Sequence, residues 1–183
     1  MIGSAVLGLL AITHLLQASQ RYDTDALVKI AKDEVRSAVR GEFTKCEAVH
    51  PPRPVFVTIE VNGSIRGCRG SLQVRTKSLE EEVALAARGA AAHDPRYRPL
   101  LRSELSKFLV TVTVVESQVP ISDVSTLRPD DGLVLQSGNR FGVVLPWEGK
   151  DPNVRLDWAF RKAGVSPGAS VALFLLKASR FKG

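Results

Sequence analysis

At 183 residues, the chain is long enough to bury a sizeable core in one domain, or in one domain with a small lobe. Its 44% hydrophobic and 24% charged residues are ordinary globular values. Two cysteines are too few for a disulfide framework, so we expect a cytoplasmic protein in a reducing compartment. The net charge of +6 permits nucleic acid or an anionic substrate as partner. The arginines are scattered, however, and only 6% of residues are aromatic, which argues against a nucleic-acid surface with interleaved stacking side chains.

The first twenty residues differ in composition from the rest. Residues 2–16 are apolar, but no Lys or Arg precedes them, as a signal peptide would require. They are also too short and too interrupted by glycine for a membrane span. We therefore expect residues 1–20 to be an N-terminal extension that forms an extra docked helix, residues 21–183 to be the domain, and the protein not to enter a membrane.

Residues 24–40 have apolar side chains at three- and four-residue steps, which predicts an amphipathic helix. Asp23 or Thr24 is a suitable N-terminal cap, and Gly41 is a suitable stop. A loop with three prolines then leads to residues 55–61, where apolar and polar side chains alternate as in a strand.

Asn62 and Gly63 follow that strand, and this dipeptide favours a type I′ turn because both central residues need positive φ. The return strand continues through residues 64–71. The sequence thus predicts a β-hairpin.

The rest of the chain alternates helices with further strands. We expect a helix at 78–92 with Ser78 and Glu81 at capping-box spacing, strands at 108–116, 133–135, 141–146 and 169–177, and a helix opened by Asp151 and Pro152 and closed by Gly164. The order lacks regular βαβ alternation. It predicts an α+β fold, with a mixed, largely antiparallel sheet flanked by helices.

The return strand carries the sharpest chemical signal, because Cys68 lies between two glycines and two arginines. Positive charge from Arg66 and Arg69 favours a thiolate, which is the nucleophilic form of cysteine. Gly67 and Gly70 let a ligand or another backbone approach closely. In a regular strand, Arg66 and Cys68 share one face and Arg69 lies on the other.

The alternative for Cys68 is a small buried hydrophobe, with the glycines serving only the turn and the packing of the Ala-rich helix. A nucleophilic thiol needs a general base, and the sequence offers three histidines, of which His93 is the best placed. The alternative for His93 is a solvated cation at a helix end. Cys46, His50, Cys68 and His93 could in principle supply four zinc ligands, but their spacing matches no zinc motif, so we predict no metal and no cofactor.

The segment IRGCRGSL resembles the LRGCIG-type signature of the AMMECR-type domain family, whose prokaryotic members include AmmeMemoRadiSam system protein A. Five further segments lie in the family's order: ALVKIAKDEV, DPRYRPL, VTVTVVESQVPI, GNRFGVVLP and KAGV. The resemblance covers residues 24–182. It implies larger and smaller subdomains, and work alongside a MEMO-type protein and a radical-SAM protein.

The resemblance also includes Asp94 and Arg96 of DPRYRPL. Arg96 could bind an anion bidentately or cover apolar surface, and Asp94 could form no more than an Asx-turn. The leading hypothesis is an enzyme or enzyme component, with Cys68 as nucleophile or covalent carrier and Arg66, Gly67, Arg69, Gly70, Asp94 and Arg96 around an anionic substrate. The alternative is a non-catalytic binding or adaptor module for a protein or a nucleic acid.

Overall fold

The structure, a computed structural model, describes residues 22–183. Within them it has the helices α2 (Thr24–Arg40), α3 (Leu79–Ala92) and α4 (Pro152–Ala163), the short 3-10 helices η1 (Arg102–Glu104) and η2 (Val124–Thr126), and the strands β1 (Val55–Val61), β2 (Ser64–Ser71), β3 (Phe108–Ile121), β4 (Gly132–Ser137), β5 (Arg140–Val144) and β6 (Ala172–Lys182). The helix predicted within residues 1–20 lies outside the described residues.

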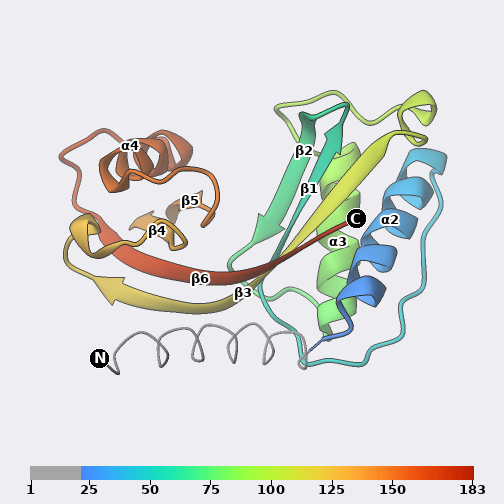
Figure 1. Ribbon diagram of the computed structural model, residues 1–183, viewed down its shortest axis with the longest axis horizontal. Helices are drawn as coiled ribbons and strands as arrows, with labels where there is room; N and C mark the ends of the chain where they lie inside the picture. The colour runs from blue at the N-terminus through green and yellow to red at the C-terminus, as the bar shows by residue number, and fades with distance from the viewer. Residues whose placement is uncertain (1–21) are drawn as a thin grey trace, which may run out of the picture. The chain divides into compact units, whose positions relative to one another are not determined.

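The strands form one sheet in the order β2-β1-β3-β6-β4-β5 (Figure 1). The pairings of β1 with β2 and β3, and of β4 with β5 and β6, are all antiparallel. The predicted α+β class with a largely antiparallel sheet is therefore confirmed. No helix among residues 22–183 has both the length and the apolar content needed to cross a membrane.

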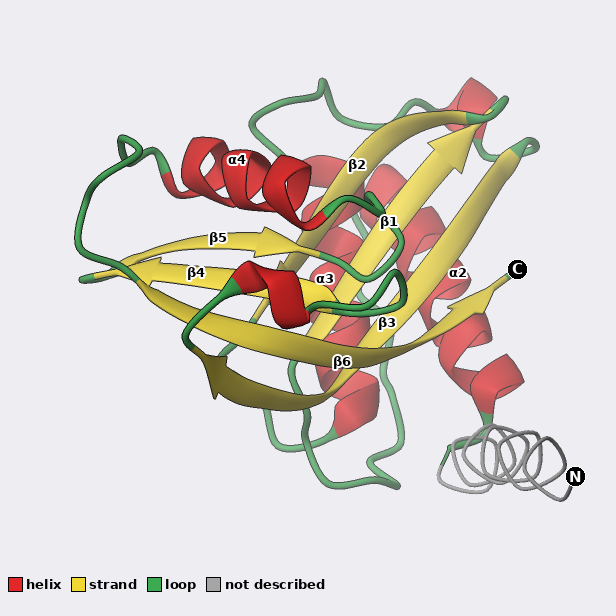
Figure 2. Cartoon of the chain, turned by 60° about the vertical axis from the view of Figure 1, so that its left-hand side comes forward, coloured by secondary structure: helices red, strands yellow, loops and turns green. Residues whose placement is uncertain are grey.

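The chain divides into two compact units, which are the larger and smaller subdomains that we expected. The first contains the residues up to Val114 together with Arg180–Gly183, and is here called the outer unit because it contains both ends of the described sequence. The second, the inner unit, contains Val115–Ser179. Strands β3 and β6 are long and belong to both units (Figure 2).

In the outer unit, α2 and α3 bury their apolar faces against the alternating side chains of β1, as both patterns predict. Val55, Val57 and Ile59 are buried, whereas the intervening residues of β1 are partly exposed. The carboxylate of Asp23 accepts the backbone N–H of Ala26, at 2.9 Å, and so caps α2. This packing fixes which face of β1 meets the helices, and therefore which face carries its polar side chains.

The hairpin turn has the predicted geometry, but its return strand is irregular. Asn62 has φ 52° and Gly63 has φ 78°, the positive values that a type I′ turn needs. The register then shifts, because Ile59 lies opposite Gly67 whereas Glu60 lies opposite Ile65. Arg66 is the extra residue of this bulge. The regular strand that would have placed Arg66 and Cys68 on one face is therefore not formed.

In the inner unit, α4 packs against the hairpin of β4 and β5. Asp151 caps the helix through the backbone N–H groups of Asn153 and Val154, and Gly164 ends it with φ 66°, as the sequence predicts. Arg155 is fully buried, and its guanidinium donates to four backbone carbonyls, those of Arg128, Pro129, Asp131 and Gly149. A buried arginine that binds two loops in this way has no local sequence signature.

Strand β6 continues to Lys182, five residues beyond the predicted end. Its last residues keep a strand conformation because Gly183 and Val110 exchange two backbone hydrogen bonds, of 2.9 and 3.0 Å. This pairing is long-range, so the local pattern of ASRFK could not indicate it.

Candidate functional site

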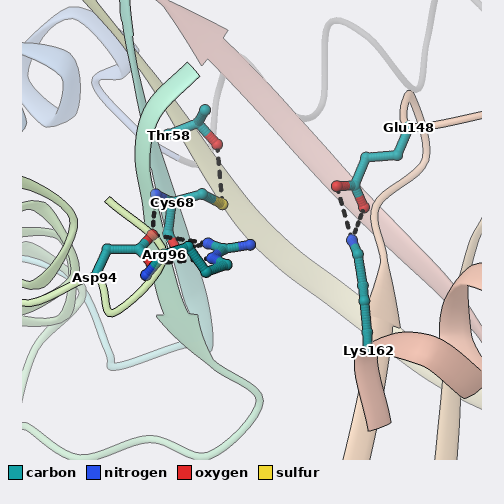
Figure 3. Close-up of polar contacts among 6 residues, drawn as sticks. All are labelled: Thr58, Cys68, Asp94, Arg96, Glu148 and Lys162. Atoms are coloured by element: carbon teal, nitrogen blue, oxygen red, sulfur yellow. Dashed lines mark hydrogen bonds and ion pairs between the residues drawn. The ribbon is translucent and has the colours of Figure 1, made fainter. Parts of the chain in front are cut away.

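Cys68 lies in β2, at one end of the strand order, and its backbone groups point away from β1. Its N–H donates to Asp94 Oδ2, at 2.8 Å, and its carbonyl accepts from Arg96 Nη2, at 2.7 Å (Figure 3). Cys68 therefore faces Thr58 as a non-hydrogen-bonded pair, in which side chains come close together. The Thr58 hydroxyl donates to the Cys68 Sγ, at 3.3 Å. The sequence places the thiol in this strand, and the register gives it a hydroxyl partner.

Asp94 lies in the turn after α3, and its side chain is only 1% exposed. Oδ1 accepts the Arg96 N–H, at 3.1 Å, which forms the Asx-turn that we considered. Burial alone would raise the pKa of the Asp94 carboxyl, but hydrogen bonds from the Arg96 side chain, the Cys68 N–H and the Arg96 N–H lower it to about 2. Asp94 is therefore a fixed anion at neutral pH and a poor proton acceptor.

Arg96 is held by Asp94 but is not covered. Its Nε donates to Asp94 Oδ1, at 2.9 Å, and its Nη2 donates to Asp94 Oδ2, at 2.8 Å. The Asp94 carboxylate raises the pKa of the guanidinium. Among residues 22–183 the remaining nitrogen, Nη1, has no hydrogen-bond partner, and the side chain is 56% exposed. The bidentate edge that the sequence offered to a ligand is thus occupied by Asp94, and Nη1 is left to bind an anion.

The other two arginines of the predicted site lie elsewhere. Arg66 donates to both carboxylate oxygens of Glu104, at 2.7 and 3.1 Å, and this ion pair is largely buried. The hydrogen bond from Arg66 lowers the pKa of the Glu104 carboxyl. Arg66 therefore already has an anionic partner within the chain.

Arg69 faces away from the thiol. It pairs with Val57, whose side chain is buried on the helix side of β1, whereas Cys68 pairs with Thr58. The Cβ of Arg69 lies close to Gly89 of α3. The structure therefore brings Cys68 together with Asp94 and Arg96, but not with the two arginines that flank it in sequence.

Gly67 and Gly70 serve close backbone packing. A Cβ on Gly67 would lie 2.0 Å from the carbonyl oxygen of Ala90 in α3, and one on Gly70 would lie 2.2 Å from that of Val55. Gly67 thus packs against the Ala-rich helix, as the packing alternative expected, whereas Gly70 packs against β1.

His93 ends α3 and is exposed, and its backbone N–H donates to the Gly89 carbonyl, at 2.9 Å. Within the described part of the chain no hydrogen bond joins its ring to the thiol. His50 instead contacts Glu80, with 2.6 Å between Nδ1 and Oε1. No group of three or more His, Cys, Asp or Glu residues among residues 22–183 is placed to hold a metal ion.

Cys46 gives an internal contrast to Cys68. It lies in the loop between α2 and β1, and burial raises the pKa of its thiol, as do the nearby carboxylates of Glu34, Glu80 and Glu81. Both cysteines are half-buried free thiols. The surroundings of the two thiols therefore differ: carboxylates lie near Cys46, whereas Cys68 lies beside the Asp94–Arg96 ion pair, whose guanidinium keeps one nitrogen open.

Sequence reasoning missed two residues of this region, Thr58 and Glu104. The hairpin turn did contain a signal for the first, since it pairs residues 61 and 64 and so brings Thr58 near Gly67 and Cys68. The bulge in β2 then decides that Thr58 lies opposite Cys68 and not opposite Gly67. Glu104 is 38 residues from Arg66, and nothing local links them.

Comparisons with known proteins agree with the resemblance found in the sequence. Residues 19–183 match the family model AMMECR1. A protein of Aeropyrum pernix is 37% identical over 164 residues, which cover 80% of this chain and 70% of the relative. One of Methanocella arvoryzae is 32% identical over 165 residues, covering 81% and 83%. The crystal structure of an uncharacterised protein of Pyrococcus horikoshii has a TM-score of 0.77 at 23% identity, covering 85% of this chain and 89% of that one, and so shares the fold.

Proposed function

This chain belongs to the AMMECR1 family, and from that premise we propose that it is an enzyme or enzyme component in which Cys68 attacks an anionic substrate held by Arg96. The observation that carries the proposal is the hydrogen bond from Thr58 to the Cys68 sulfur, beside a guanidinium with an open nitrogen.

Two side chains prepare the thiol for this role. The Thr58 hydroxyl donates to the sulfur and so fixes the orientation of the Cys68 side chain. Arg96 is permanently cationic, and its bonds to Asp94 and to the Cys68 carbonyl hold it beside the thiol. An anionic group bound at Arg96 Nη1 would place the rest of a small substrate near the sulfur.

The surroundings also limit the reaction. The pKa of Asp94, about 2, keeps it ionised and fully engaged, so it does not take the thiol proton. We therefore propose direct attack by the thiolate on an electrophilic carbon. The sulfur–carbon bond forms, the leaving group departs with the electron pair of its bond, and the thiol proton has gone to solvent. Arg66, paired with Glu104, then stabilises the strand rather than binding the substrate.

The resemblance to AmmeMemoRadiSam system protein A supports a further part of this proposal, that the chain works with a MEMO-type and a radical-SAM protein in the cytoplasm. Co-expression with a tagged copy of each candidate tests it. Retention of both partners through purification at moderate salt is expected, and loss of both would contradict it.

A pair of alkylating reagents tests the site itself. Iodoacetate is anionic and iodoacetamide is neutral, and both transfer a carbon to sulfur with loss of iodide. We expect the iodoacetate-to-iodoacetamide rate ratio to be about fivefold higher at Cys68 than at Cys46, since a charge at about 4 Å contributes about 1 kcal/mol or more. Peptide mass spectrometry separates the two sites, and Cys68→Ser confirms the assignment.

Equal ratios at the two cysteines would contradict the proposal. Cys68 would then be a packing residue, and the binding-module alternative would take its place. In that case steeply salt-dependent binding of single-stranded DNA or RNA would identify a nucleic acid as the partner.

A further inference from the structure

The outer edge of β5, in the inner unit, is closed by an ion pair. The Val143 carbonyl accepts from Lys162 Nζ, at 2.9 Å, and the Leu145 N–H donates to Glu148 Oε2, at 2.7 Å. Lys162 Nζ also contacts both oxygens of Glu148, at 2.8 and 2.7 Å (Figure 3). One cation and one anion, bound to each other, thus satisfy one backbone group of β5 and one of Leu145, the residue that follows β5 and begins the turn to Glu148.

The Val143 carbonyl is a group that a neighbouring strand would use, and the Leu145 N–H is the next such group along the chain, one residue beyond β5. Among residues 22–183, β5 is the last strand in the sheet order and pairs with β4 alone. In an antiparallel strand, backbone groups two residues apart point to the same side, so the Val143 carbonyl and the Leu145 N–H both face away from β4. Glu148 and Lys162 therefore take the place of a missing strand.

The same arrangement occurs independently in the outer unit. At the free edge of β2, Asp94 accepts the Cys68 N–H and Arg96 donates to the Cys68 carbonyl. Unpaired strand edges invite association with other strands, and charged side chains are a common protection. The repetition indicates that the pairs protect the edges of the sheet.

We propose that the Glu148–Lys162 pair keeps the outer edge of β5 closed against a second copy of this chain, and that removing the pair lets two chains associate through β5. A second copy is the natural occupant, because antiparallel strands pair about a twofold axis and β5 is then its own complement. Phe141, in the same strand, has a side chain that is 41% exposed and adds apolar surface to this edge.

Removing the pair should leave the chain folded. The side chains of Lys162 and Glu148 are 37% and 31% exposed, and ion pairs with such exposure add little to stability. Neither residue belongs to the proposed thiol site, so this proposal stands or falls separately from the proposed function.

The test uses a double variant that combines Glu148→Ala and Lys162→Ala. Sedimentation equilibrium over a range of concentrations compares this double variant with the wild-type chain. We expect the dimer dissociation constant to fall by about tenfold or more, because each freed edge group can form a new hydrogen bond worth about 0.5–1.5 kcal/mol. The matched control is Asp33→Ala with Lys29→Ala, which removes an ion pair of the same charge from the surface of α2 and should leave the mass unchanged.

A third substitution locates the contact. Val143→Pro removes an N–H on the outward side of β5 and spares the bonds to β4, so adding it to the double variant should restore the wild-type mass. Association that persists with Val143→Pro would overturn the proposal, as would a folded double variant with the wild-type mass. Should the double variant not fold, amide exchange in the wild-type chain decides: slow exchange at Leu145 and fast exchange at Val143 is expected, and equal rates would contradict the proposal.

Discussion

Strands β2 and β5 have two features in common: each has a glycine where a helix backbone comes closest, and each has an acid–base pair on its free edge. A Cβ added to Gly67 of β2 would lie 2.0 Å from the carbonyl oxygen of Ala90, and one added to Gly142 of β5 would lie 1.9 Å from that of Ala159. β2 adds a thiol with a hydroxyl partner, a buried carboxylate and an exposed guanidinium. The comparison teaches that the glycine and the acid–base pair are common to both edges, and that the thiol of Cys68, the hydroxyl of Thr58 and the open nitrogen of Arg96 distinguish the candidate site.

The largest expected effect is on stability, and it tests the close glycine–helix contacts that β2 and β5 share. Gly67→Ala and Gly142→Ala should each destabilise the chain by about 3 kcal/mol, because the new methyl group would meet helix backbone that cannot move aside. Chemical denaturation measures both. Gly138→Ala is the control: its Cβ would meet nothing within 4 Å, and its positive φ alone should cost about 1 kcal/mol. A loss at Gly67 or Gly142 no larger than this control would show that the helices do not approach so closely.

The next largest effect is the difference between Asp94 and Glu148 in how much each carboxylate stabilises the chain. Asp94→Asn removes a nearly buried carboxylate that serves both the Cys68 N–H and Arg96, and should lower the free energy of unfolding by about 2 kcal/mol at pH 7. Glu148→Gln changes a more exposed ion pair and should lower it by less than about 1 kcal/mol. Equal losses from thermal or urea unfolding would contradict the distinction between the two edges.

Lowering the pH tests the contribution of Asp94 to stability in a second way. The folded-state pKa of Asp94 is about 2, below its ordinary value of 3.8, so its stabilisation is complete above about pH 4 and is lost as the pH falls towards 2. The stability difference between the wild-type chain and Asp94→Asn should therefore shrink through this window. A difference that stays constant from pH 5 to pH 2 would mean that Asp94 is not held as an anion.

The smallest effect concerns the thiol alone. Thr58→Val keeps the shape of the side chain but removes the donor to the sulfur, and should slow alkylation of Cys68 by about threefold with little loss of stability. Thr111→Val is the matched control, because Thr111 lies opposite Thr58 on β3. A similar slowing by both variants would show that the hydroxyl of Thr58 has no special role.

Much of the fold could be predicted from local patterns. The caps of α2 and α4, the Asn62–Gly63 turn and the alternation in β1 each act within a few residues, and the structure has all of them. What could not be predicted depends on long-range contacts. The extension of β6 requires Val110, and the burial of Arg155 requires carbonyl groups from two separate loops.

The candidate site divides in the same way. The sequence indicates Cys68, Asp94 and Arg96, and the structure brings these three together. It could not indicate that the bulge at Arg66 places Cys68 opposite Thr58, because an unbroken register from the turn would have placed Gly67 there. The sequence also could not show that Arg66 forms an ion pair with Glu104. Adjacency in sequence thus overstated the role of the flanking arginines, and the strand register decided which cation lies beside the thiol.

The most direct measurement of the central claim uses two methanethiosulfonates, one anionic and one cationic, on the wild-type chain and on Arg96→Gln, with Cys46→Ser in both. The thiolate displaces sulfinate from either reagent and forms a mixed disulfide, so charge is the main difference between them. We predict that wild-type Cys68 prefers the anionic reagent and that Arg96→Gln lowers this preference about fivefold or more, as the loss of one nearby unit charge requires. The same ratio in both proteins would mean that Arg96 does not act on ligands of Cys68, and would contradict the proposed site.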